Sequence, residues 1–425
     1  MYLYSACARV ENKLPTMSQK LIESHSRIIE KIAEDQGFKE YEVYVNSGSE
    51  KGDNYLGVLT AVTVKSDGRK LELILKSTPR DDNARKSSPM RAAFLREIHL
   101  YERIFRALRK FQDEFNIAEP FDCYAKLYAT STEEFDEFLV MENLKSDGYQ
   151  LWNKKIPMNP DHISRVIREY AKFHAANVAM KHNNPALFEI ITEDVMYSIW
   201  DNEEVMKNRT VFKDYLKTVL DLGYKTVGED ASLIGFLRDV EEEIPKIIFD
   251  EFKKSDEYRQ SLIHGDAWCN NIMFKYKDPD DTRTPVSLKF IDWQISYVCT
   301  PAYDFCYFFL AHSPKEVLDD YKTYLELYYD TFSQQLNYFG CEPEEVFSYS
   351  RFIRHINKCM VVGLFACCTV LKVMLCEPTK HLDAKAGKQV DLLESLNSNV
   401  NDNEVLRQRI KDIILFVKNN NFLSK

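Results

Sequence analysis

The chain has no excess of positive charge. Its 425 residues carry a formal net charge of −10 at neutral pH. Proteins that hold nucleic acids present a basic face to the phosphate backbone, so this balance argues against a nucleic-acid partner. The same balance argues against a protein that is held electrostatically at a membrane surface.

The cysteines have neither paired spacing nor the spacing of a zinc site. The ten are scattered, and several fall inside apolar runs, where cysteine behaves as a small hydrophobic residue. The first five residues lack a charged region followed by an apolar one, so we predict no leader and a reduced, cytoplasmic location. Met17 could be an alternative start, which would make the first sixteen residues dispensable.

Long apolar runs are almost absent. Only Cys359–Cys376 approaches the length of a membrane span, and it contains Thr369 and Lys372 within a longer helical pattern. We therefore predict a buried helix here and no membrane span. The 45% of apolar residues and 13% of aromatic residues can still bury a sizeable core. This length suits two or three domains or one large two-lobed enzyme.

The most informative segment spans residues 262–271. Asp266 and Asn271 lie at the two ends of one short loop in this segment, and Asp292 follows 21 residues after Asn271, at the end of a strand-like run over 286–291. Phosphoryl transfer from ATP requires a carboxylate that orients and deprotonates the acceptor hydroxyl, and hard oxygen ligands for Mg²⁺. We predict Asp266 as the catalytic base, and Asn271 and Asp292 as the magnesium ligands.

A polar turn between two hairpins is the alternative interpretation of this segment. A lone His-x-Asp pair would favour the turn, because such a pair is usually a capped turn. The complete pattern over 264–271 favours phosphoryl transfer. For His264 we expect a structural role that fixes the loop backbone rather than a proton shuttle.

The residues ahead of this segment have the pattern of a small sheet with a helix. An amphipathic helix is predicted over 18–37, and two strands, 56–65 and 70–76, are joined by a hairpin turn at Gly68. The polar turn around Gly52 could lie over nucleotide phosphates, because glycine lets the backbone approach a ligand closely. An ordinary hairpin turn is the equal alternative.

Lys76 and Glu97 are predicted to form an ion pair. Lys76 closes an apolar strand, and Glu97 lies on the inward stripe of a helix predicted over 89–111, three residues after Phe94. A carboxylate on an apolar face is costly without a cation, which favours the pair over two unrelated surface charges. Lys76 would then hold nucleotide phosphates, and Glu97 would hold Lys76.

These motifs resemble those of the protein-kinase-like small-molecule phosphotransferases, the group of the choline and aminoglycoside kinases. They are more similar still to the ecdysteroid kinase-like family, which is expanded in arthropods. The resemblance runs from about residue 50 to residue 310. It rests on five segments: His264–Asp266 with Asn271, Ile291–Trp293, Pro301–Asp304, Lys51–Tyr55 and Glu142–Leu144.

The resemblance implies an α+β, protein-kinase-like fold of two lobes. The N-lobe, 1–143, would hold the nucleotide on a small antiparallel sheet, and the C-lobe, 144–425, would be mostly helical. ATP and Mg²⁺ are the implied cofactors. Gly52 and Asn54 would belong to the loop over the phosphates. Glu142 and Asn143 would lie at the crossing between the lobes, which offers backbone groups to adenine.

Departures from the protein-kinase pattern indicate a small acceptor. Gly265 stands where protein kinases carry an arginine that docks a phosphorylated activation loop, and Trp268 stands where they carry lysine. Only eleven residues separate Asp292 from Asp304, which leaves no room for a long activation segment or a peptide platform. Asp304 is expected to cap the following helix and to brace the 264–271 loop.

The resemblance also implies the acceptor. It would be an ecdysteroid hydroxyl or a xenobiotic alcohol conjugated for detoxification, and Trp268 and Trp293, which flank the predicted chemistry, suit an apolar hydroxylated molecule. A helical pattern begins at about Asp161, with His174 as a core histidine. By the resemblance, the helices after the Asp292 loop would wall the acceptor site. A non-catalytic pseudokinase that binds a small lipophile is the alternative from another class. An aminoglycoside-type kinase with an acidic acceptor pocket is a third possibility.

Overall fold

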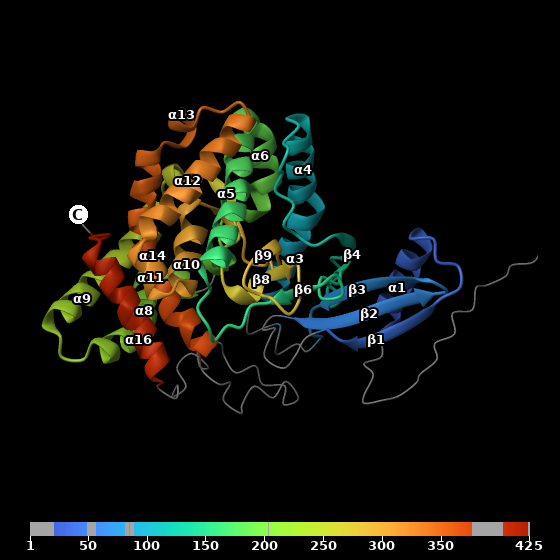
Figure 1. Cartoon of the computed structure of the whole chain (residues 1–425), viewed down its shortest axis with the longest axis horizontal. Helices are drawn as coiled ribbons and strands as arrows, with labels where there is room; N and C mark the ends of the chain where they lie inside the picture. Colours follow the sequence, from blue (N-terminus) through green and yellow to red (C-terminus); the bar gives the residue numbers. More distant parts are fainter. Residues whose placement is uncertain are drawn as a thin grey trace, which may run out of the picture.

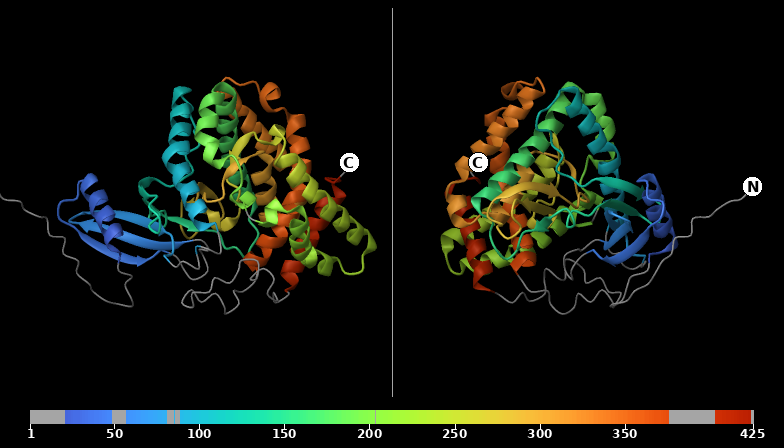
Figure 2. Two further views of the ribbon diagram at one scale, coloured as in Figure 1. Left: turned by 180° about the vertical axis from the view of Figure 1, so that it is seen from behind. Right: turned by 45° about the vertical axis from the view of Figure 1, so that its right-hand side comes forward.

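The computed structural model describes residues 21–48, 57–80, 85, 89–202, 204–375 and 403–423. A small β-sheet with one helix forms one end of the molecule, and a large helical body forms the other (Figure 1). The two further views keep this arrangement, with the blue sheet projecting from the helical body (Figure 2). Gly52 and Asn54 lie outside the described residues.

The sheet has five antiparallel strands in the order β1-β2-β3-β5-β4. Alternate side chains of β2 and β3 are buried, as expected for a sheet with one covered face. That face packs on helix α1, Glu23–Asp35, and the strands are β1, Glu42–Ser47; β2, Val58–Ser66; β3, Arg69–Ser77; β4, Leu127–Ser131; and β5, Phe138–Glu142. The predicted helix and hairpin are confirmed.

The helix predicted over 89–111 is present with one irregular turn. It consists of α3, Met90–His99, a π-helical turn at Leu100–Ile104, and α4, Phe105–Glu114. Its buried side chains join the core of the helical body, whereas α1 and most of the sheet form a separate small core. The polypeptide of α3 and α4 thus belongs by packing to the second part of the molecule. The boundary at residue 143 stays a prediction.

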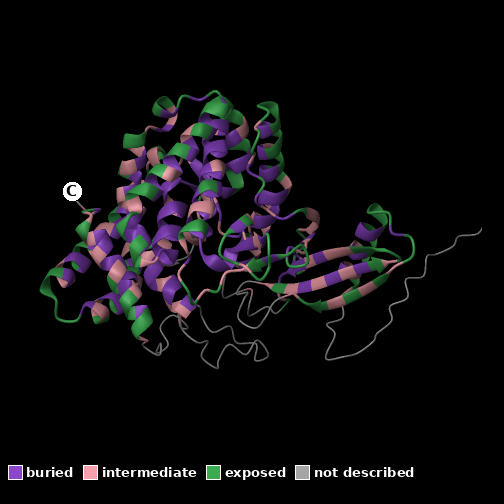
Figure 3. Cartoon of the chain, viewed as in Figure 1, coloured by how far each residue is buried: buried purple, intermediate pink, exposed green. Residues whose placement is uncertain are grey.

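The rest of the described chain is helical apart from five short strands. Buried residues concentrate where the helices face one another (Figure 3). The longer helices are α5, Pro160–Asn183; α6, Pro185–Thr192; α8, Arg209–Val227; α9, Ala231–Lys246; α10, Ala302–His312; α12, Tyr321–Tyr338; α14, Tyr349–Leu375; and α16, Glu404–Asn419. The shorter ones are α7, Glu204–Lys207; α11, Lys315–Asp319; and α13, Pro343–Phe347. The mostly helical second part that the resemblance implies is therefore confirmed.

Two small sheets within the helical body carry the 264–271 loop. Strand β7, Ser261–Ile263, pairs with β10, Tyr297–Cys299, just before the loop begins. Three further strands form the second sheet, in the order β6-β8-β9, and the loop leads directly into it: β6, Tyr149–Leu151; β8, Ile272–Tyr276; and β9, Pro285–Phe290. Because β8 and β9 form a hairpin, the chain returns after β9 to the 264–271 loop and places Asp292 beside it.

One stretch of the described chain, Pro343–Leu375, is long and apolar enough to cross a membrane by length and composition alone. Of its most apolar window, 61% is buried inside the protein. A core helix passes the same test when its apolar faces are covered by neighbours. Helix α14 packs against α10, α16 and α8, which agrees with the prediction of a buried helix.

Candidate active site

Asp266 and Asn271 are in direct contact at the centre of the site. The Asn271 side-chain amide donates to Asp266 Oδ2 at 2.8 Å and to the Asp266 backbone oxygen at 3.1 Å. A short 3-10 turn at Cys269–Asn271 closes the loop and brings the amide back to the carboxylate. The two ends of the predicted loop therefore meet.

Gly265 has a backbone that only glycine adopts readily. Its φ is +82°, and a Cβ atom at this position would lie 2.7 Å from the backbone oxygen of Ile295. A side chain cannot be accommodated without movement of the backbone. This steric constraint explains why Gly265, rather than the arginine that protein kinases carry, occupies this position.

Asp304 holds the backbone of the 264–271 loop. Its carboxylate accepts hydrogen bonds from the backbone N–H groups of His264, at 2.6 Å, and Gly265, at 2.9 Å. It also contacts His174 Nε2 at 3.2 Å, and His174 Nδ1 lies 2.7 Å from the Tyr328 hydroxyl. The expected bracing role is confirmed. The expected cap on α10 is wrong, because no side chain caps this helix and the Asp304 oxygens face the loop.

His264 is a structural histidine. Its Nδ1 accepts the backbone N–H of Asp266 at 3.3 Å, so its Nε2 carries the proton and donates to the Ile291 oxygen at 3.0 Å. Burial lowers the pKa of His264, which keeps the ring neutral. With both nitrogens engaged, the ring joins the 264–271 loop to the strand end that carries Asp292.

Lys76 joins two carboxylates. Its ammonium lies 2.6 Å from Glu97 Oε2 and 2.8 Å from Asp292 Oδ1, which confirms the predicted ion pair and adds Asp292 to it. Burial alone would lower the pKa of Lys76, but the charges of Asp292 and Glu97 outweigh it and raise the pKa. Glu97 also accepts the backbone N–H of Trp293 at 3.2 Å. Lys76 therefore remains charged and fixed.

Asp292 has a left-handed backbone, with a φ of +63°. This conformation is uncommon for residues other than glycine and clusters at functional sites. Burial, followed by the negative charge of Asp292, raises the pKa of Asp266 to about 6. The two carboxylates are thus close enough to repel each other, and this repulsion favours a cation between them.

The donor set fits a magnesium ion. The described residues contain no group of three or more histidine, cysteine, aspartate or glutamate side chains that could hold a metal. Mg²⁺, however, keeps several waters and commonly takes only one or two protein ligands together with substrate phosphates. The Asn271 amide oxygen and the Asp292 carboxylate meet that requirement. Burial is the main cause of the raised pKa of Asp266, and the charge of Asp292, which is the second cause, is one that a cation would offset.

Tyr307 was missed by the sequence interpretation. Its hydroxyl donates to Asp266 Oδ1 at 3.1 Å, whereas the Trp268 indole N–H donates to Oδ2 at 3.2 Å. The signal was the helical spacing on α10, because Tyr307 lies three residues after Asp304 and so shares its face. Both oxygens of Asp266 are held by neutral donors.

The two predicted flanking tryptophans differ. Trp268 contacts Asp266, as expected from its place in the loop. Trp293 does not line the site. Its side chain is fully buried and packs on Phe105, Phe173 and His264. The expectation that Trp293 lies beside an acceptor is therefore wrong.

The crossing residues Glu142 and Asn143 are bound within the protein. Their backbone N–H groups donate to the oxygens of Lys126, at 2.9 Å, and Glu72, at 3.0 Å. The Glu142 carboxylate accepts the backbone N–H of Lys126, and the Asn143 side chain accepts that of Lys145. A nucleotide contact by this pair stays a prediction, and these two N–H groups are not free for it.

The strand lysine paired with a helix carboxylate, the loop carrying Asp266 and Asn271, and the returning Asp292 define a protein-kinase-like phosphotransferase of the small-molecule class. The departures at Gly265 and in the short 292–304 segment separate it from protein kinases. The chain belongs to the ecdysteroid kinase-like family, whose model matches residues 51–341. The predicted family and the α+β two-lobed fold class are confirmed.

Among solved structures, the chain is similar to a GDP complex of a mutant aminoglycoside 2'-phosphotransferase IIIa, with a TM-score of 0.44 and 14% sequence identity. The match covers 94% of this chain and 98% of that one. No curated protein matches the chain.

Proposed function

We propose that this protein transfers the γ-phosphoryl group of ATP to a hydroxyl group of a small molecule, with Mg²⁺ as the metal. The observation that carries the proposal is the meeting of Asp266, Asn271, Asp292 and Lys76 at one place, although they come from distant parts of the chain. Phosphoryl transfer needs mainly this kind of positioning and charge stabilisation.

Each residue has a physical role in this proposal. Asp266 accepts the proton of the acceptor hydroxyl and orients that hydroxyl toward the phosphate. Its raised pKa, about 6, brings it closer to neutral pH than an ordinary aspartate, while leaving it ionised above that value. Asn271 and Asp292 would hold the metal, which when bound neutralises charge on the phosphates.

Lys76 is suited to phosphate binding. A lysine ammonium has three donors, and two of them face Glu97 and Asp292. The third donor remains for a phosphate oxygen. Glu97, which is fully buried, keeps the ammonium in place and charged.

The acceptor belongs to the same proposal. Neutral donors, Tyr307 and Trp268, hold the base, and this arrangement suits an uncharged alcohol better than a polycation, which would favour an acidic pocket. An ecdysteroid hydroxyl or a xenobiotic alcohol conjugated for detoxification fits this chemistry, and the family name supports the former. A cytoplasmic location is also proposed, supported by eight free, buried cysteines in the described chain.

An ATP-consumption assay tests the proposal. Full-length protein is incubated with ATP, Mg²⁺ and a panel of steroids, plant phenolics, amino alcohols and aminoglycosides. We expect turnover with hydroxylated steroids or phenolics and none for Asp266→Asn. Turnover confined to aminoglycosides would indicate the aminoglycoside-type kinase. Tight binding of an acceptor with no ATP consumption by the wild type would favour the non-catalytic binding protein.

A further inference from the structure

The last turn of α10 contacts the far end of the 264–271 loop. His312, the final residue of this helix, is fully buried, and its Nε2 accepts the backbone N–H of Cys269 at 2.9 Å. We propose that His312 is a positioning residue for phosphoryl transfer, because it fixes the turn that carries Asn271 and so sets the place of Asn271 beside Asp266. This role rests on the proposed phosphotransferase activity.

Two contacts fix the tautomer of the His312 ring. A backbone N–H can only donate, so the Nε2 that faces Cys269 carries no proton. The proton is then on Nδ1, which donates to the backbone oxygen of Phe308 at 2.9 Å. Burial lowers the pKa of His312 to about 3, which keeps the ring neutral. His312 therefore presents a fixed acceptor, rather than a charge, to the loop.

The bond to Cys269 lies at the start of the turn that carries the proposed metal ligand. Residues 269–271 form a single 3-10 turn. The first N–H groups of a helical turn find no partner inside it, and His312 supplies one for Cys269. The side-chain amide of Asn271, at the other end of the turn, donates to Asp266. Because the turn is this short, a displacement of Cys269 also displaces Asn271.

Helix α10 holds the loop at three places. Asp304 accepts two backbone N–H groups where the loop begins, and Tyr307 donates to the carboxylate of Asp266. His312 adds the third contact, near the end of the loop. A misplacement of about 1 Å in an active site can cost about 100-fold in rate. Holding both ends of the loop on one helix therefore has a direct consequence for the proposed reaction.

The turn that carries His312 is itself fixed by two other segments. The backbone N–H of Met158 donates to the His312 backbone oxygen at 2.9 Å. The guanidinium of Arg409, on α16, donates to the Ala311 backbone oxygen at 3.0 Å. These bonds satisfy carbonyl groups that the end of a helix leaves without partners. Helix α16, which follows the residues that the family model matches, thus supports the same part of the site.

Two matched variants, His312→Gln and His312→Asn, test the role of His312. The Gln amide oxygen can reach the place of Nε2 and accept the Cys269 N–H, whereas the shorter Asn side chain can only replace Nδ1 and donate to the Phe308 oxygen. Each variant therefore keeps one of the two bonds. We measure steady-state ATP consumption with the steroids and phenolics of the panel, and amide hydrogen exchange of residues 262–271 in the full chain.

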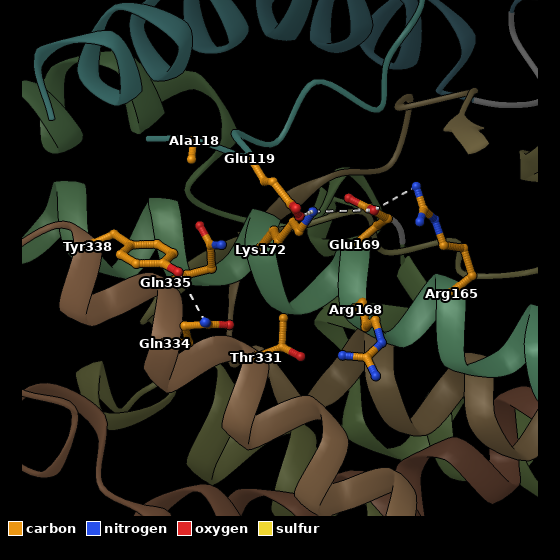
Figure 4. Close-up of a pocket in the computed structure, with 10 residues that line it drawn as sticks. All are labelled: Ala118, Glu119, Arg165, Arg168, Glu169, Lys172, Thr331, Gln334, Gln335 and Tyr338. Atoms are coloured by element: carbon orange, nitrogen blue, oxygen red, sulfur yellow. Dashed lines mark hydrogen bonds and ion pairs between the residues drawn. The ribbon is translucent and has the colours of Figure 1, made fainter. Parts of the chain in front are cut away.

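Lys172→Met controls for a general loss of stability. Lys172 lines a cavity of about 210 Å³ between α5 and α12, where its ammonium lies 3.0 Å from Glu119 and 3.6 Å from the buried Glu169 (Figure 4). None of the residues that line this cavity belongs to α10 or to the 264–271 loop. The variant should lower the temperature of unfolding without faster exchange in the loop.

We expect His312→Asn to lower kcat at least about tenfold, with a much smaller change in the KM for ATP, and His312→Gln to keep most of the kcat. The loop amides should exchange faster in His312→Asn than in the other three proteins. Equal exchange in the two His312 variants, or equal kcat in an active protein, would overturn the role of His312. So would equally fast loop exchange in Lys172→Met.

The exchange measurement separates this role from the phosphotransferase activity. A wild type that consumes no ATP, together with faster loop exchange in His312→Asn alone, would support the hold of His312 on the loop and count against the proposed function. An active wild type with equal exchange in both His312 variants would leave the proposed function standing and remove the role of His312.

Discussion

The Tyr307 hydroxyl lies 3.1 Å from Asp266 Oδ1, so the candidate base is held by the helix that follows the Asp292 segment. This donor stabilises the ionised carboxylate and lowers the pKa of Asp266 against the opposing effects of burial and Asp292. The pKa that results, about 6, is therefore a balance in which Tyr307 takes part.

Tyr307→Phe should move the acid limb of the pH–rate profile to higher pH. An ionised base is required, so activity rises as the pH passes through the pKa of Asp266. Loss of one donor should raise that pKa by up to about one unit, the scale of a hydrogen bond to a charged group. Tyr303→Phe is the control, since its hydroxyl does not bond to Asp266. An unchanged limb in Tyr307→Phe would show that Tyr307 does not tune the base.

Asp266→Asn should stabilise the protein at neutral pH. The pKa of Asp266 is raised, from 3.8 to about 6, so the folded state binds more protons than the unfolded state between these values and stability falls as pH rises. Above about pH 6 the full destabilisation by the ionised Asp266 carboxylate is present, and removing its charge should recover roughly 1–3 kcal/mol of the free energy of unfolding. Denaturant unfolding at pH 4 and pH 7.5 measures this. A variant less stable than the wild type at pH 7.5 would contradict the expectation.

Lys76→Met and Glu97→Gln should be strongly non-additive. Lys76→Met leaves the Glu97 carboxylate buried without its cation, which should cost about 3–5 kcal/mol of the free energy of unfolding. The double variant removes both charges and should lose much less than the sum of the single losses. A double-mutant cycle by urea unfolding gives the coupling. Additive losses would mean that the 2.6 Å contact contributes little.

Gly265→Ala should destabilise the 264–271 loop. Alanine there would face both a φ of +82° and an oxygen 2.7 Å from its Cβ atom, and such strain costs of order 1–3 kcal/mol. Gly228→Ala is the matched control, because Gly228 also has a positive φ, +60°, but no atom lies within 4 Å of the added Cβ. Thermal unfolding should rank Gly265→Ala below the control. Equal losses would leave only the backbone conformation as the cause.

Local sequence predicted the site where the chemistry lies within one loop or one periodic element. Asp266 and Asn271 are only five residues apart, within one loop. Lys76 ends an apolar strand and Glu97 lies on the apolar face of a helix, so strand and helix periodicity was enough to predict that Lys76 and Glu97 form a pair.

The remaining features depend on tertiary packing. Tyr307 reaches Asp266 because α10 packs against the 264–271 loop. Trp293 is buried because α3 and α4 pack against the segment that carries Asp292. No local sequence pattern encodes this packing. The bond from Lys76 to Asp292 joins residues 216 positions apart. The direction of the Asp304 carboxylate, toward the loop rather than its own helix, is decided by the same packing.

The most direct test of the account is the Mg²⁺ dependence of ATP binding, measured by titration calorimetry for the wild type and for Asp292→Asn. Asparagine tolerates the left-handed backbone of Asp292, so the variant removes the negative charge, and with it one ion-pair partner of Lys76, without straining the backbone. We predict that Mg²⁺ strengthens ATP binding to the wild type and that the variant loses this dependence. Equal, Mg²⁺-dependent binding by both proteins would contradict the assignment of Asp292, and no ATP binding by the wild type would contradict the proposed function itself.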